Sequence, residues 1–238
     1  MAQGVAWLGL QPLEWLVRKP CPLCRQSLPP GDLRAHLCAS CATTLMLPPD
    51  GLHGTSPLPW WAAGPYIGAY RRILLDLRQR PHQESVAALL RRVTLPAFPQ
   101  AVAPLMVPVP SWKKQANPLP GLICRMACRK WRWRDADLLR RSRPVLGQHH
   151  LNRAMRMENQ KDAFTCARRP TTKEKRTHPL ILVDDILTSG ATALSATEAL
   201  KRAGWRVQGL ICLARTPGGR HPTNGDLRSS SREGDRPG

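Results

Sequence analysis

The residues best suited to chemistry are two adjacent acids and the hydroxyl-rich turn that follows them. Asp184 and Asp185 come after an unbroken aliphatic run at 180–183, which predicts a strand buried on both faces. The turn leads into a predicted helix that ends at Gly204. Backbone N–H groups, a helix dipole and hydroxyls around one small space favour a phosphate. The turn consists of Thr188, Ser189, Gly190, Ala191 and Thr192.

The two carboxylates need a different partner, because they repel a phosphate. At the carboxyl end of a parallel strand, Asp184 and Asp185 are suited to accept hydrogen bonds from sugar hydroxyls or to face a hydrated divalent cation. The plain structural alternative is a buried strand with an acidic end, followed by a helix N-cap.

This pattern resembles the phosphoribosyl pyrophosphate (PRPP) signature of type I phosphoribosyltransferases: an aliphatic strand, two acids, then Thr-Ser-Gly-x-Thr. The resemblance implies that Asp184 and Asp185 hold the ribose 2′ and 3′ hydroxyls. It also implies that residues 188–192 hold the 5′-phosphate and that Mg²⁺ accompanies PRPP.

Four cysteines near the start of the chain form a second candidate site. They make two C-x2-C pairs separated by thirteen residues, a spacing typical of a tetrahedral zinc site. A segment this short buries too little surface to fold alone, which favours a structural metal. Disulfides are the alternative, and a reducing compartment disfavours them. The predicted ligands are Cys21, Cys24, Cys38 and Cys41.

Length and charge restrict the class of protein. The 238 residues suffice for one α/β domain of about 150 residues and a small accessory module. We expect a soluble, cytoplasmic protein, because no apolar run approaches the about 20 residues of a membrane span. The formal net charge of +20 favours polyanionic partners such as nucleic acid, although a basic proteome or a solvated face would also produce it.

The composition along the chain predicts five segments. We expect an amphipathic segment at 1–19, the zinc-knuckle module at 20–47, a Pro- and Gly-rich linker at 48–65, the main domain at 66–216 and a disordered tail at 217–238. Within the main domain, helical patterns start at Tyr70 and after Pro81, and a short strand spans 105–109. Lys113 and Lys114 follow that strand, where they could bind pyrophosphate or simply be solvated.

Residues 119–133 predict a basic helix. Tryptophans at 112, 131 and 133 interleave with its cations, a mixture that can stack bases and neutralise the phosphates of single-stranded DNA. Packing in the core is the alternative use of these tryptophans. Cys124 and Cys128, one turn apart on this helix, are interpreted as ordinary helix residues.

The order of the motifs resembles the competence protein F (ComF) family. A cysteine knuckle, a Val-Pro-x-Pro strand end, a middle segment and the PRPP motif follow one another over residues 20–216. The chain departs from the family after the Val-Pro-x-Pro element, where only Asn117 corresponds to the usual Arg-Gly-Phe-Asn-Gln stretch. The middle segment has helical spacing and matches at Gln148, Leu151, Arg156, Asn159, Ala163 and Phe164.

The resemblance implies a type I phosphoribosyltransferase fold, mostly parallel, and a role in natural competence. The expected partners are PRPP, imported single-stranded DNA and other DNA-uptake proteins. The alternative is a Mg²⁺-dependent phosphoribosyltransferase, similar to amidophosphoribosyltransferases, in nucleotide metabolism or salvage. For such an enzyme the candidates that stabilise the departing pyrophosphate are Lys113, Lys114 and Arg156.

Overall fold

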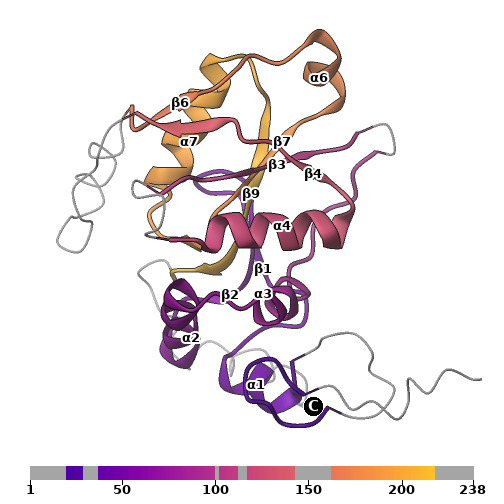
Figure 1. Cartoon of the computed structure of the whole chain (residues 1–238), viewed down its shortest axis with the longest axis vertical. Helices are drawn as coiled ribbons and strands as arrows, with labels where there is room; N and C mark the ends of the chain where they lie inside the picture. The colour runs from indigo at the N-terminus through magenta and orange to yellow at the C-terminus, as the bar shows by residue number, and fades with distance from the viewer. Residues whose placement is uncertain (1–19, 29–36, 100–101, 112–116, 143–161, 218–238) are drawn as a thin grey trace, which may run out of the picture.

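A twisted, mostly parallel sheet forms the centre of the molecule in the computed structural model, which describes residues 20–28, 37–99, 102–111, 117–142 and 162–217 (Figure 1). The strand order is β1-β2-β9-β7-β3-β4, and β8 pairs with β9. Within the described chain the β1–β2 pair is antiparallel and the other pairs of this sheet are parallel. The strands are β1 (Leu52–Gly54), β2 (Trp60–Pro65), β3 (Leu105–Pro108), β4 (Arg134–Asp135), β7 (Leu180–Val183), β8 (Ile186–Leu187) and β9 (Val207–Arg215).

Helices connect the parallel strands, because such strands need a crossover. The predicted helices at 70, after 81, at 119 and after the hydroxyl turn are confirmed, and Gly204 (φ +94°) follows the last of them. The described helices are α1 (Ala39–Thr44), α2 (Gly68–Gln79), α3 (Gln83–Leu90), α4 (Leu119–Trp131), α6 (Thr172–Thr177) and α7 (Ala191–Arg202). None of them is both long enough and apolar enough to span a membrane.

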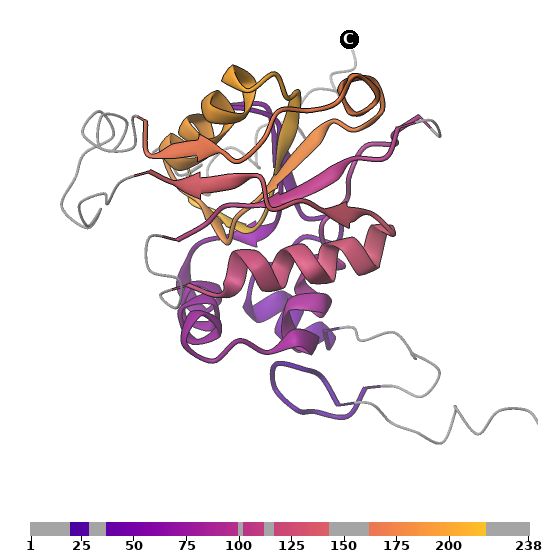
Figure 2. The same cartoon turned by 45° about the horizontal axis from the view of Figure 1, so that its top comes forward.

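Two hydrophobic cores lie on opposite faces of the sheet. The alternation of side chains along a strand divides β7, so that Ile181 and Val183 join one core and Leu180 and Leu182 join the other. Helices α2, α3 and α4 cover the first face and α7 covers the second (Figures 1 and 2). All four β7 residues are therefore buried, as the aliphatic run predicts.

The predicted linker at 48–65 is wrong, because both of its halves contribute a strand to the main sheet. Strand β2 occupies Trp60–Pro65 and pairs with β9 inside the main sheet, and β1 pairs with β2. Surrounding prolines and glycines gave this stretch the composition of a linker. The strand needs its small residues: a Cβ on Gly64 would lie 2.4 Å from a Leu47 methyl carbon. A glycine in this strand thus reflects close packing.

A small two-stranded sheet lies on the α7 side. Strands β5 (Leu139–Arg141) and β6 (Phe164–Cys166) pair antiparallel, and Phe164 is buried in the second core. The predicted middle segment lies outside the described residues over 143–161, and its Phe164 belongs to a strand. The predictions for 1–19 and for 218–238 also lie outside the described residues.

Candidate functional site

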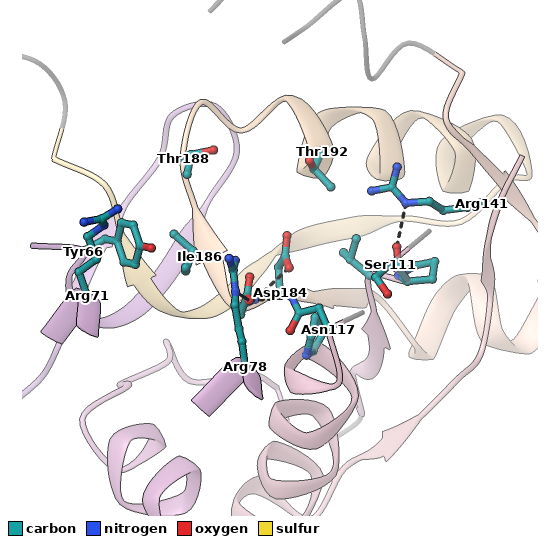
Figure 3. A pocket seen from close by; sticks show the side chains of 14 residues that line it. Tyr66, Arg71, Arg78, Ser111, Asn117, Arg141, Asp184, Ile186, Thr188 and Thr192 are labelled. Carbon is teal, nitrogen blue, oxygen red and sulfur yellow. Dashed lines mark hydrogen bonds and ion pairs between the residues drawn. The ribbon is translucent and has the colours of Figure 1, made fainter. Parts of the chain in front are cut away.

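A polar cavity of about 490 Å³ opens at the carboxyl ends of β3 and β7 (Figure 3). This is the edge at which open α/β sheets bind ligands. Its described lining brings together the acids, the hydroxyl turn and three arginines. The lining residues are Tyr66, Arg71, Arg78, Val109, Pro110, Ser111, Asn117, Pro120, Arg141, Asp184, Asp185, Ile186, Thr188 and Thr192.

Asp185 is held by contacts within the protein. Its carboxylate Oδ2 accepts hydrogen bonds from Arg78 Nε at 2.6 Å and from Asn117 Nδ2 at 2.7 Å. Its backbone carbonyl accepts from the N–H groups of Leu213 and Ala214 on β9. Only 3% of Asp185 is exposed, so the ion pair with Arg78 compensates a buried charge.

Asp184 lies beside these contacts of Asp185 and is partly exposed in the cavity. Its Oδ1 accepts a hydrogen bond from the backbone N–H of Asp185 at 2.9 Å. Burial, and then the negative charge of Asp185, raise the pKa of Asp184. The two acids therefore differ: Asp185 is tied to the scaffold, and Asp184 is the carboxylate whose environment a ligand would change most.

The hydroxyl turn forms the start of α7. Gly190 is the N-cap residue with φ +83°, a left-handed conformation that suits glycine. A Cβ there would lie 2.2 Å from Cγ of Pro57, so alanine would also collide with the neighbouring loop. Of the five predicted phosphate-binding residues, Thr188 and Thr192 line the cavity. The Ser189 hydroxyl accepts a hydrogen bond from the N–H of Ala191 at 3.4 Å.

The sequence analysis missed the arginines of the cavity. Arg71 and Arg78 lie seven residues apart, or about two turns, on α2 and so share one face. That spacing was a usable signal, whereas nothing local predicts Arg141 on β5. Asn117, the residue that matches the ComF pattern, lines the cavity. The catalytic candidates Lys113, Lys114 and Arg156 lie outside the described residues.

The cavity thus has acids in its centre and cations around them. Arg71 stacks over the Tyr66 ring at 5.9 Å on one side, and Arg141 lies on the other side near Ser111 (Figure 3). A ligand with hydroxyl groups in its middle and phosphate groups at its ends matches this distribution of charge.

The four predicted metal ligands lie together. The sulfur atoms of Cys21, Cys24, Cys38 and Cys41 are all within 4.8 Å of one another. Sulfur separations of 3.9 Å (Cys21 and Cys41) and 3.5 Å (Cys24 and Cys38) fit a tetrahedral ion with Zn–S bonds of about 2.3 Å, which spaces its sulfurs about 3.8 Å apart. A disulfide needs about 2.05 Å. The cluster can therefore bind a metal such as zinc, and its cysteines are free thiols.

The cysteine cluster is attached to the main domain. The Ser85 hydroxyl on α3 donates a buried hydrogen bond to the Pro22 carbonyl at 3.0 Å, and Cys21 is part of the first core. On the cluster's second pair, the N–H of Cys41 donates to the Cys38 sulfur at 3.3 Å at the start of α1. The cluster thus packs against α3, on the side of the sheet that α2 and α3 cover.

The tryptophans at the end of the basic helix pack within the protein, which was the alternative to stacking on DNA bases. Trp131 stacks on Trp133 with ring centroids 5.9 Å apart, Lys130 lies over the Trp131 ring at 4.5 Å, and Phe98 meets Trp133 edge-on. Both tryptophans pack against the first core. Their rings already have protein partners, so the exposed cations Arg125 and Arg129 are the groups that α4 offers to a polyanion. Trp112 lies outside the described residues.

Known proteins resemble the chain over nearly its whole length. It is 27% identical over 233 residues to the DNA utilization protein YhgH of Salmonella typhi, which covers 90% of this chain and 97% of the relative. The protein of that name from Escherichia coli strain K12 is 26% identical over 232 residues with the same coverage. No protein-family model matches the chain. Over 90% of its length the chain is thus similar to proteins named for DNA utilization.

Proposed function

We propose that the chain is a ComF-like protein of DNA uptake that keeps a PRPP-type ribose-phosphate site. In this proposal it has the type I phosphoribosyltransferase fold, lies in the cytoplasm and handles imported single-stranded DNA. The observation that carries the site is the cavity in which Asp184, the start of α7 and three arginines face one space. The names of the relatives support the connection with DNA.

The residues present fit a Mg²⁺-bound PRPP. Asp184 would accept hydrogen bonds from the ribose hydroxyls, while Asp185 keeps its contacts with Arg78 and Asn117. Thr188 and Thr192, with the N-terminal N–H groups of α7, would hold the 5′-phosphate. The Mg²⁺ would neutralise charge on the pyrophosphate. The cysteine cluster would hold a structural zinc, because four thiolates leave no open coordination position.

Calorimetry tests this site. We expect the zinc-loaded protein to bind PRPP in the presence of Mg²⁺, and Asp184→Asn to weaken binding at least tenfold. Asp137→Asn is the matched control, because Asp137 is a surface carboxylate paired with Arg140 and its side chain is 77% exposed. Equal PRPP affinity in the wild type and Asp184→Asn, or no binding by the folded wild type, would contradict the proposal.

Phosphoribosyl transfer is the second candidate, and the cationic lining favours it. The arginines of the lining could stabilise pyrophosphate as its bond to the anomeric carbon breaks and an acceptor attacks that carbon. The test is release of pyrophosphate from PRPP in the presence of nucleobase or amine acceptors. Binding without turnover over the whole acceptor panel would leave the ribose-phosphate site as a binding site only.

The DNA part of the proposal rests on charge. The net charge of +20 and the exposed Arg125 and Arg129 suit the phosphates of a single strand. We expect fluorescence anisotropy to show binding of a labelled oligothymidylate that weakens steeply as salt rises. Each phosphate contact should add about 0.7 to the slope of log affinity against log salt for a single strand.

A pair of double variants locates this contribution. Arg125→Gln with Arg129→Gln should reduce the salt slope by about 1 to 2 if each arginine meets one phosphate. Lys173→Gln with Arg176→Gln removes the same charge from α6, which lies on the other side of the sheet (Figures 1 and 2). Equal losses in both double variants would show that only total charge matters and would contradict a role for α4.

A further inference from the structure

Arg141 carries a buried group that the described protein leaves without a partner. Its Nη1 is buried and has no hydrogen-bond partner among the residues that the structure describes. Arg141 lines the cavity, as do Ser111 on the β3 side and Thr192 on the α7 side. Removing a guanidinium N–H from water without a partner is costly, so an arginine held in this position beside a polar cavity favours an anionic ligand there.

The local structure fixes the guanidinium in this position. Arg141 is the last residue of β5, and its Nε donates a hydrogen bond to the Pro110 carbonyl at 3.0 Å. The guanidinium also lies 4.6 Å from the centre of the Phe164 ring on the paired strand β6. One edge of the group is thus bound to the residue two positions after β3, which leaves the Nη atoms for a ligand (Figure 3).

The charges around Arg141 support an anionic ligand. Burial lowers the pKa of Arg141, and the negative charge of Asp184 opposes that change. Asp185 already pairs with Arg78. An anion bound at Arg141 would offset the loss of hydration that burial causes for the charged guanidinium. The two parallel N–H donors of a guanidinium, which form a fork, also match the spacing of phosphate oxygens.

The place of Arg141 in the cavity selects which phosphate group it meets. The 5′-phosphate of the proposed ligand is assigned to Thr188, Thr192 and the start of α7. Arg141 is tied instead to Pro110, beside Ser111, at the carboxyl end of β3. The acids lie between Arg141 and the Tyr66 and Arg71 end of the cavity (Figure 3).

We infer that Arg141 binds the pyrophosphate group of the ligand at the β3 side of the cavity. This inference rests on the proposed ribose-phosphate function and deepens it, since it assigns the diphosphate end to a residue of β5. Arg141 orients and neutralises the pyrophosphate, which would be retained in a binding protein and would leave in a transferase.

The experiment compares three probes by calorimetry with Mg²⁺: inorganic pyrophosphate, ribose 5-phosphate and PRPP. We expect Arg141→Gln to weaken pyrophosphate and PRPP at least tenfold and to change the affinity for ribose 5-phosphate less than twofold. Arg141→Lys, which keeps the charge without the fork, should retain part of the pyrophosphate affinity. Arg140→Gln is the control, because Arg140 is the neighbouring residue on β5 and pairs with Asp137 at the surface.

Three results would overturn the inference: unchanged pyrophosphate affinity in Arg141→Gln, an equal loss of ribose 5-phosphate, or the same loss in Arg140→Gln. The proposed function fails separately, if the wild type does not bind PRPP. In that case the titration with pyrophosphate alone decides the inference. The inference fails if the wild type does not bind pyrophosphate, or if Arg141→Gln binds it equally well. Arg141→Met, which keeps an apolar contact with Phe164, replaces Arg141→Gln if the glutamine variant does not fold.

Discussion

Replacing Gly190 by alanine places a methyl group in the hydroxyl turn, where two separate costs can be worked out. The left-handed φ of +83° costs a residue with a Cβ about 1–2 kcal/mol. The new Cβ would also lie 2.2 Å from a Pro57 ring carbon, and relieving such an overlap typically costs about 1–3 kcal/mol. We expect Gly190→Ala to lower the free energy of unfolding by about 2–5 kcal/mol.

Two other glycines separate these terms. Gly68 also has a positive φ (+48°), but its added Cβ would meet only a Met46 methyl carbon at 4.0 Å, so Gly68→Ala should cost about 1–2 kcal/mol. Gly121 lies inside α4 without a positive φ, and its Cβ would meet only the end of the Arg125 side chain at 3.7 Å. Gly121→Ala should therefore stabilise the protein by about 0.5–1 kcal/mol.

Urea denaturation of the three variants measures these differences, and calorimetry with PRPP measures the effect on the turn. The order of stability should be Gly121→Ala, wild type, Gly68→Ala and then Gly190→Ala. Only the last should also lose affinity for PRPP, because only Gly190 borders the predicted phosphate site. A Gly190→Ala protein as stable as Gly68→Ala would refute the packing of Pro57 against the turn.

Further predictions concern the ion pair between Arg78 and Asp185, the pKa of Asp184 and the four-cysteine cluster. Arg78→Met should lower the free energy of unfolding by about 1–3 kcal/mol, which is less than for a fully buried ion pair because about a third of the Arg78 side chain is exposed. In urea denaturation, adding Asp185→Asn should recover part of this loss. No recovery in the double variant would contradict the ion pair. The affinity for PRPP should rise between pH 6 and 8, by at most about tenfold per pH unit, and then level off, because the pKa of Asp184 is raised to about 8 and sugar hydroxyls bind the ionised carboxylate. In Asp184→Asn the affinity should not change with pH. A pH profile that this substitution leaves unchanged would contradict the assignment. A metal-release assay should find one zinc per chain. Chelation of the metal or Cys41→Ser should lower the melting temperature, because metal binding contributes to folding. An unchanged melting temperature after metal removal would contradict a structural role of the metal.

The stability effect of Asp184 itself has a definite sign. Because the pKa of this carboxyl is raised in the folded protein, the folded state keeps its proton at a pH where the unfolded chain has lost it. The stability that this group contributes is therefore complete below its ordinary pKa of about 3.9 and is lost as pH rises towards about 8. The proposed ligand needs the ionised carboxylate, so PRPP binding and stability should change in opposite directions with pH.

The parts of the fold predictable from the sequence are those with strong local signals. The strand at 180–183 was predictable because its aliphatic residues fill both cores, and the helix after it because its turn and Gly204 mark both ends. Strand β2 was not, because prolines and glycines near it also occur in linkers. Its membership of the sheet depends on pairing with β9, about 150 residues later, which no local pattern contains.

The same distinction holds for the site. The acids, the hydroxyl turn and the four cysteines have spacings that predict a ribose-phosphate site and a metal site, and the structure brings the four cysteines together. Arg78 and Asn117 reach Asp185 across 107 and 68 residues, so their roles appear only when the chain is folded. Arg141 is one of many arginines in a chain with 36 Lys and Arg residues, and only its burial distinguishes it.

A crystal structure of the zinc-loaded protein with PRPP and Mg²⁺ tests the central claim most directly. The proposal predicts the 5′-phosphate against Thr188 and Thr192, the ribose hydroxyls within hydrogen-bond distance of Asp184, and the pyrophosphate beside Arg141. Ligand bound elsewhere on the protein, with this cavity empty, would contradict the assignment of a ribose-phosphate site to the carboxyl ends of β3 and β7.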